Sequence, residues 1–205
     1  MDSIKTVFFR AGGVLLPSLY QTAVDVLKRS GTVSVKSRTR DEVHTLAESL
    51  AVGLVDESAF CKRIYELSSE SMDQDEVYRS IESSKGSGID LLKLLDKIKK
   101  SFDLFLISDY PREWLGRLLN RFGLTACFDD SSIVYCPEKE IKNFIPDIFP
   151  IISQTAGQPK GRCLVVDSRA YITSEALRYG LHAVVWVDTF RLQRELLLRG
   201  VVRTS

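Results

Sequence analysis

The chain has 205 residues, of which 44% are apolar and 27% are charged, and this balance is ordinary for a folded domain with a sizeable core. Its length suits one domain, or one domain that carries an insertion. The 28 basic and 27 acidic residues leave a net charge of +1, so no overall field favours nucleic acid or an anionic membrane, and we expect neither as a partner.

Five short apolar runs along the chain predict buried β-strands. Each run is nearly continuous, which is typical of strands that are covered on both faces of a parallel sheet. In chain order, the expected strands are Thr6–Phe9, Leu104–Ile107, Ile133–Tyr135, Cys163–Val166 and Ala183–Val187.

The stretch between the first and second expected strands is far too long for a single crossover connection, and its apolar residues recur with helical spacing. We therefore expect residues 17–86 to form an all-helical cap, inserted between two parts of an α/β core, residues 1–16 and 87–205. Such an insertion would lie over the carboxyl ends of the strands, where open α/β sheets bind their ligands.

Polar and small residues mark the helix ends around this insertion. Asp56 is expected to cap a helix within it. The segment KGSG at residues 85–88 indicates a hinge back to the core, and Asp90 is expected to cap the helix that follows.

Helices also separate the later strands. Pro111 predicts the start of one helix and Gly123 its end, and two more are expected from about Ala170 to Gly180 and from about Asp188 to Gly200. Strands that alternate with helices of this length predict an α/β fold with a Rossmann-like, doubly wound parallel sheet.

Three segments, each at the end of an expected strand, form a recognisable set: VFFRAGGVL at Val7–Leu15, LISD at Leu106–Asp109 and LVVDS at Leu164–Ser168. In this order, with a helical insertion after the first, they resemble the first, second and fourth motifs of the haloacid dehalogenase (HAD) superfamily. The resemblance covers nearly the whole chain and implies the HAD-like fold with a helical cap.

The resemblance also implies catalytic roles that this chain retains only in part. The family's first-motif aspartate is a nucleophile that forms a covalent intermediate. Arg10 stands at that position, and a guanidinium cannot replace a carboxylate nucleophile. The general acid/base two residues later is replaced by Gly12, whereas the second-motif hydroxyl is present as Ser108.

The remaining motif positions concern charge neutralisation and metal binding. The family's third-motif lysine usually precedes a proline, and Cys136 stands there, with Lys139 close by. In the fourth motif Asp167 matches the metal-binding carboxylate, and the adjacent second acid has become Ser168. An arginine beside a single carboxylate would repel magnesium, so we expect a lost magnesium site and no cofactor.

Each retained or replaced residue has more than one interpretation. Arg10 either binds an anion in a repurposed pocket or forms a structural ion pair with Asp167, and we favour the ion pair. Ser108 either binds phosphate or caps the loop into the next helix. We interpret Gly12 as a requirement of backbone geometry after the strand, and Cys136 as a small buried thiol.

Three hypotheses on function follow from these residues. The first is a HAD-like pseudoenzyme, a binding or regulatory module whose ligand is a small anion or a protein partner. The second is an active HAD-type hydrolase, of the phosphatase or dehalogenase class, with a nucleophile relocated to Asp109 or Cys136. The third is an interaction module that docks through its cap. We favour the first, and the sequence leaves the oligomeric state open.

Cysteine spacing and apolar runs predict the location of the protein. The four cysteines form no C-x-x-C pair, which argues against a zinc site and a disulfide framework. The first residues lack the features of a secretory signal, and no apolar stretch approaches the ~18 residues that span a bilayer. We therefore expect a cytoplasmic protein with free thiols.

Overall fold

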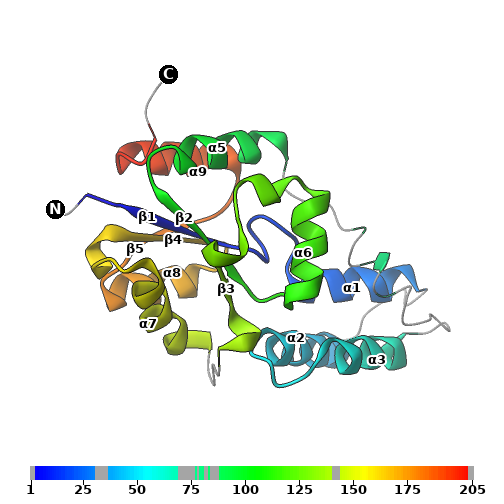
Figure 1. Ribbon diagram of the computed structural model, residues 1–205. Coiled ribbons are helices and arrows are strands. Elements are labelled where there is room, and N and C mark those ends of the chain that lie inside the picture. The colour runs from blue at the N-terminus through cyan, green and yellow to red at the C-terminus, as the bar shows by residue number, and fades with distance from the viewer. Residues whose placement is uncertain are drawn as a thin grey trace.

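The computed structural model describes residues 3–30, 37–68, 77, 79–80, 83, 88–139 and 144–202. In this part of the chain, five strands form one sheet in the order β3-β2-β1-β4-β5, and all neighbours are parallel (Figure 1). The strands are β1 (Thr6–Arg10), β2 (Asp103–Ser108), β3 (Ile133–Tyr135), β4 (Cys163–Asp167) and β5 (His182–Val185). The predicted doubly wound α/β fold is confirmed.

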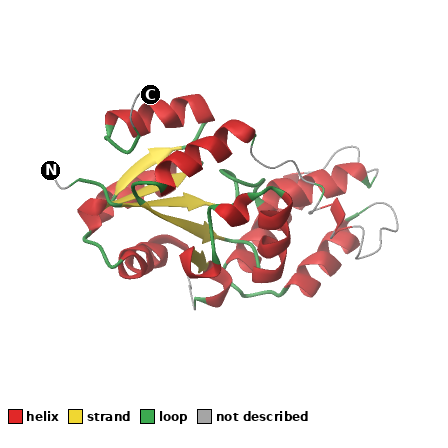
Figure 2. Ribbon diagram, turned by 45° about the horizontal axis from the view of Figure 1, so that its top comes forward, coloured by secondary structure: helices red, strands yellow, loops and turns green. Residues whose placement is uncertain are grey.

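Helices connect the strands and cover both faces of the sheet. They are α1 (Leu19–Arg29), α2 (Ser37–Ala51), α3 (Glu57–Leu67), α5 (Ile89–Lys99), α6 (Arg112–Arg121), α7 (Phe144–Ala156), α8 (Ala170–Tyr179) and α9 (Thr189–Leu198). On one face α5 packs on α9, and these helices contact β2 and β5; on the other, α8 contacts β4 and β5 and packs on α7. Figures 1 and 2 show the two helix layers on opposite sides of the sheet.

The side chains of the central strand divide between two apolar cores. Val7 and Phe9 belong to the core on the α5–α9 side, whereas Phe8 belongs to the core on the α7–α8 side, where it stacks on Phe105 with 5.1 Å between ring centroids. Every residue of β1 is buried, because helices cover both faces. Arg10 is the charged residue at the end of this buried strand.

The described residues within the predicted insertion are mostly helical, and none of them contributes a strand to the sheet. Helices α1, α2 and α3 lie beyond the carboxyl ends of the strands (Figures 1 and 2). Val43, Leu50 and Phe60 of these helices belong to the same apolar core as the α5–α9 face of the sheet. Phe60 also meets Trp114 of α6 edge to face, at 5.9 Å between ring centroids. The boundaries of the cap stay a prediction.

Two predicted caps differ in outcome. Asp56 caps α3, accepting a hydrogen bond of 2.7 Å from the Ala59 amide, as expected. The prediction for Asp90 is wrong: α5 begins after Gly88, without a side-chain cap, and Asp90 lies in its first turn. A carboxylate there still favours the helix, because it faces the positive end of the dipole. Of the predicted hinge at residues 85–88, residues 85–87 lie outside the described residues.

The fifth strand is shorter than its apolar run predicts. It ends at Val185, and the next amide, that of Trp186, still donates to the Asp167 carbonyl at 2.9 Å. Val187 lies outside the core and is 55% exposed. Apolar residues therefore continue past the end of the strand at this edge of the sheet.

Helix α7 lies in a stretch for which no element was predicted, and it contains Pro150 in its interior, where proline is normally disfavoured. Its buried residues Ile148, Phe149 and Ile152 nonetheless recur at helical spacing and enter the α7–α8 core. Among the described residues, no helix combines the length and apolar character needed to cross a membrane.

Candidate functional site

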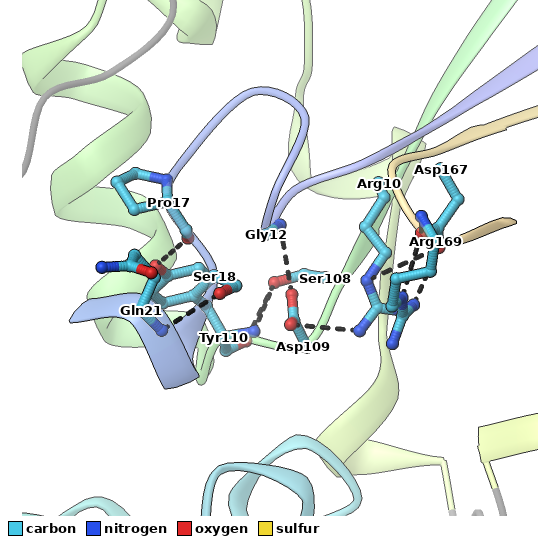
Figure 3. A network of polar contacts seen from close by, with 10 residues as sticks. All are labelled: Arg10, Gly12, Pro17, Ser18, Gln21, Ser108, Asp109, Tyr110, Asp167 and Arg169. Carbon is cyan, nitrogen blue, oxygen red and sulfur yellow. Dashed lines mark hydrogen bonds and ion pairs between the residues drawn. The ribbon is translucent and has the colours of Figure 1, made fainter. Parts of the chain in front are cut away.

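The order of the strands brings charged residues together at one edge of the sheet. Arg10 ends β1, Ser108 ends β2 and Asp167 ends β4, and β1 lies between the other two. Parallel strands present their carboxyl ends on the same side, so residues far apart in sequence become neighbours there. Figure 3 shows Arg10, Asp109, Asp167 and Arg169 grouped at this edge.

One ion pair at this edge joins Arg10 to Asp109. The Arg10 Nη2 atom lies 3.0 Å from Asp109 Oδ2, and the two side chains are only 3% and 9% exposed. The Gly12 amide donates to the other carboxylate oxygen of Asp109 at 3.2 Å. Burial alone would raise the pKa of Asp109, but the charges of Arg10 and Arg169, with hydrogen bonds, hold it below its ordinary value.

Asp167 is bound by an arginine of its own loop. Arg169 donates to the Asp167 carboxylate through Nε at 3.0 Å and through Nη2 at 2.7 Å, and its backbone amide donates at 2.9 Å. This is the two-pronged geometry in which guanidinium binds carboxylate most strongly. Burial opposes the charge of Arg169, yet its contacts with Asp167 raise the pKa of the guanidinium above its ordinary value.

The expected ion pair between Asp167 and Arg10 is present, but it is the longer of the two ion pairs formed by Arg10. The Arg10 Nε atom lies 3.9 Å from Asp167 Oδ2, at the outer limit of an ion pair. However, the closer carboxylate is that of Asp109, because Asp167 is engaged by Arg169. Sequence analysis missed both Arg169 and the pairing of Asp109. The Arg169–Asp167 pair does have a sequence signal, which is an arginine two residues after the aspartate that ends a strand.

Two glycines make room for this network. A Cβ atom at Gly12 would lie 2.7 and 2.8 Å from the carboxylate oxygens of Asp109, and a Cβ at Gly13 would lie 2.5 Å from Ser168 Oγ. Gly13 has a φ of 85°, a conformation that favours glycine, whereas Gly12 does not have a positive φ. Gly12 is therefore needed for space rather than for the backbone geometry that we expected.

Ser108 uses its hydroxyl inside its own loop. Its Oγ accepts a hydrogen bond from the Tyr110 amide and donates to the Tyr110 carbonyl, both at 3.0 Å (Figure 3). The Tyr110 hydroxyl then donates to the Pro17 carbonyl at 2.5 Å, which ties this loop to the segment before α1. Burial, followed by the charge of Asp109, raises the pKa of Tyr110, so the hydroxyl keeps its proton.

Cys136 and Lys139 do not join the cluster of charges. Cys136 is fully buried in the α7–α8 core, and this burial raises the pKa of its thiol to about 12. Lys139 is exposed, and its amide donates to the Cys136 carbonyl, closing a short 3₁₀ turn.

A pocket of about 240 Å³ opens beside the charged cluster. Strand ends form its floor, and side chains of α1, α2 and the start of α8 form its walls. Its lining residues are Arg10, Gly12, Gly13, Ser18, Leu19, Tyr20, His44, Ala47, Glu48, Ala51, Asp109, Ser168, Arg169 and Tyr171. Ser108, Cys136 and Asp167 are not among them, so the pocket brings together only Arg10 and Gly12 of the predicted site residues.

The donor set at this edge does not fit a magnesium site. Both carboxylates, Asp109 and Asp167, are in contact with guanidinium groups. Among the residues described, no group of three or more His, Cys, Asp or Glu side chains could hold a metal ion. Magnesium prefers octahedral oxygen ligands, which this arrangement does not offer.

No family model matches the chain, and no curated protein does. Solved structures do match. A HAD family enzyme from Bacteroides thetaiotaomicron has a TM-score of 0.74 at 16% identity, with 90% of this chain and 94% of that one covered. A predicted HAD-like family hydrolase from Porphyromonas gingivalis has a TM-score of 0.67 at 17% identity, with 95% of this chain and 98% of that one covered.

An L-2-haloacid dehalogenase from Xanthobacter autotrophicus is also similar, with a TM-score of 0.64 at 18% identity and coverage of 98% of this chain and 90% of that one. Identities this low establish the fold alone. The five-stranded parallel α/β architecture of this chain superimposes on these proteins over most of its length, and the chain therefore has a HAD-like fold.

Proposed function

We propose that this chain is a HAD-like pseudoenzyme, a binding or regulatory module without hydrolytic activity. The observation that carries the proposal is the Arg10 guanidinium at the end of β1, at the position that the resemblance assigns to the nucleophile. It is buried and paired with Asp109 at 3.0 Å. A guanidinium keeps its proton in proteins and has no lone pair for attack on phosphorus or carbon.

The two candidates for a relocated nucleophile are poorly suited to attack. Asp109 lines the pocket, but its carboxylate is held by Arg10 and by the Gly12 amide. These contacts stabilise the anion and so weaken it as a nucleophile. The Cys136 thiol is buried and does not line the pocket, and its raised pKa keeps it protonated at neutral pH. An active hydrolase of the phosphatase or dehalogenase class is the second candidate, and it would have to use Asp109.

The pocket beside the charged cluster supports a binding role. Arg10 and Arg169 contribute to its floor, and Tyr20, His44 and Tyr171 provide aromatic walls. We propose a small anion as its ligand, with a protein partner as the alternative. Two similar structures were solved with relevant molecules: the Bacteroides enzyme with magnesium and inorganic phosphate, and the Xanthobacter dehalogenase with chloropropionic acid covalently bound. Because its four cysteines are free and buried, we also propose a cytoplasmic location.

The catalytic half of the proposal is tested by a magnesium-supplemented assay with an aryl phosphate, a panel of sugar and nucleoside phosphates, and 2-haloacids. We expect no turnover by the wild type. Turnover of ~1 per second, typical of a slow enzyme, that is lost in Asp109→Asn and retained in Cys136→Ala would contradict the proposal. Circular dichroism must first show that both variants are folded at the assay temperature.

The binding half is tested by thermal unfolding with phosphate, sulfate, small carboxylates and metabolite phosphates in magnesium-free buffer. A ligand at about a hundred times its dissociation constant adds ~2.7 kcal/mol to stability. Tyr171→Ala should reduce that stabilisation, because Tyr171 lines the pocket. Tyr65→Ala is the matched control, an exposed tyrosine of α3 outside the pocket. Equal responses of the two variants would place the ligand elsewhere.

A further inference from the structure

We infer that Arg169, together with Arg10, takes the place of a divalent cation at this edge of the sheet, so that the cluster is complete without a metal. The inference concerns metal binding alone and does not depend on whether the chain turns over a substrate. It starts from Asp167, whose side chain is only 2% exposed at the end of β4. A carboxylate buried to this extent requires a compensating positive charge.

The local chain supplies that charge in a fixed geometry. The Arg169 amide donates to Asp167 Oδ1, which turns the chain back on itself immediately after the strand. The same turn brings the Arg169 guanidinium onto both oxygens of the carboxylate. The Arg169 guanidinium carbon also lies 5.8 Å from the centroid of the Tyr171 ring, a second contact within its own segment. All three contacts come from residues that are close in sequence.

The charges of the cluster balance. Asp109 and Asp167 contribute two negative charges, and Arg10 and Arg169 contribute two positive ones. A magnesium ion would add two further positive charges in a site of low dielectric constant, where like charges repel strongly. It would also have to displace Arg169 from the Asp167 oxygens, which are the ligands it would need.

Removing the Arg169 charge should therefore open the cluster to divalent cations. In Arg169→Gln, Arg10 alone faces two carboxylates, so the group carries a net charge of −1. In Asp167→Asn with Arg169→Gln, the remaining Arg10–Asp109 pair is neutral again. The surface residue Arg112, which pairs with Asp130 and Glu138, offers a matched control in Arg112→Ala.

The experiment measures thermal unfolding of these four proteins with millimolar magnesium and with sodium chloride of equal ionic strength, after treatment with a chelator. Magnesium should leave the unfolding temperature of three proteins unchanged relative to sodium chloride: the wild type, the double variant and Arg112→Ala. Each of the three is compared only with itself in the other salt. Arg169→Gln should unfold at a lower temperature than the wild type in sodium chloride. In magnesium its unfolding temperature should rise along a saturable curve.

Several results would overturn the inference. One is saturable magnesium binding to the wild type by calorimetry, which is decisive whatever the variants do. Another is a folded Arg169→Gln protein that does not respond to magnesium, or a response that persists in the double variant. If Arg169→Gln is unfolded in both salts, Arg169→Lys replaces it. Lysine keeps the charge, so a magnesium-dependent rise in its unfolding temperature would equally refute the role of Arg169.

Discussion

Among the described residues, the arginine–carboxylate clusters around Arg10 and around Arg112 share their chemistry and differ in their surroundings. At the sheet edge, Arg10 lies between Asp109 and Asp167 and is 3% exposed. On the surface, Arg112 binds both oxygens of Glu138, at 2.8 and 2.7 Å, and also contacts Asp130. It stacks on the ring of Tyr135, yet its side chain is 46% exposed.

By geometry alone the surface cluster is at least as well formed, because Glu138 is bound by a two-pronged guanidinium. Water can replace those bonds when the arginine is removed, so exposed pairs contribute little to stability. No water replaces Arg10 in the interior, where the loss of one partner leaves the other charge buried. The comparison teaches that burial, rather than the number or shape of the contacts, decides how much a cluster of this kind matters to folding.

The largest effect is expected for Arg10→Ala. Loss of the buried guanidinium leaves Asp109 without its closest positive charge, and such losses destabilise proteins by about 3–5 kcal/mol. Urea unfolding followed by circular dichroism gives the change. Arg10→Met combined with Asp109→Asn removes both charges and should recover much of the stability. If Arg10→Ala lowers the free energy of unfolding no more than Arg112→Ala does, burial does not decide how much each cluster contributes to stability.

A smaller loss is expected for Gly12→Ala, because the new methyl group meets the Asp109 carboxylate at 2.7 Å. Overpacking of this kind costs about 1–3 kcal/mol. Gly116→Ala is its control: Gly116 lies within α6, and a Cβ there has no neighbouring atom within 4 Å. Alanine in an open helical position should stabilise by about 0.5–1 kcal/mol. The two substitutions should thus shift the unfolding midpoint in opposite directions.

A still smaller effect is expected from pH. The folded pKa of Asp109 lies below its unfolded pKa, which is about 3.9 for a free aspartate. The stability that its ionisation provides is therefore complete above that value and is lost as the pH falls through the folded pKa. The difference in unfolding temperature between the wild type and Asp109→Asn should be constant from neutral pH to mildly acidic pH and should narrow below about pH 4. A difference that grows on acidification would assign the opposite shift to Asp109.

The smallest effect is expected for Arg112→Ala, at about 0–1 kcal/mol, the usual range of an exposed ion pair. Salt should reduce even this difference, because charges at the surface are screened. Unfolding in low and high sodium chloride measures it. A loss comparable with that of Arg10→Ala would show that the stacking of Arg112 on Tyr135 has a structural importance that its exposure does not suggest.

The sequence predicted the sheet well because its strands are covered on both faces. A run such as that of β1 is apolar throughout, and its alternation with helices permits few topologies. Prediction failed where the same signal was blurred. The apolar residues continue to Val187 although β5 ends at Val185. Helix α7, which contains Pro150, was not predicted. The described residues of the predicted insertion are mostly helical, as their apolar spacing indicated, whereas the cap itself and its boundaries stay a prediction.

The candidate site was predictable to the level of strand ends but not of side-chain partners. Arg10 and Asp167 each end a strand, so their meeting at one edge followed from the topology. Which carboxylate lies closer to Arg10 depends on distances that sequence does not contain. The Asp109 carboxylate can pair with Arg10 because Gly12 has no side chain in the space that it occupies. The Asp167 carboxylate is bound by Arg169. The spacing of Asp167 and Arg169 is a signal for their pairing, but the distance between Arg10 and Asp109 depends on how the ends of β1 and β2 pack.

The apolar core shared by the sheet and the helices beyond it has a consequence for how the protein opens. Val43, Leu50 and Phe60 belong to the apolar core that continues into the α5–α9 side of the sheet, and exposing each such side chain to water costs about 1.5–3 kcal/mol. Detaching α2 and α3 would thus approach the ~5–15 kcal/mol that unfolds a whole domain. Their backbone amides should exchange with deuterium as slowly as those of β1, as parts of one cooperative unit. The α2 wall of the pocket is then fixed, and any molecule that binds there must enter without the movement of α2.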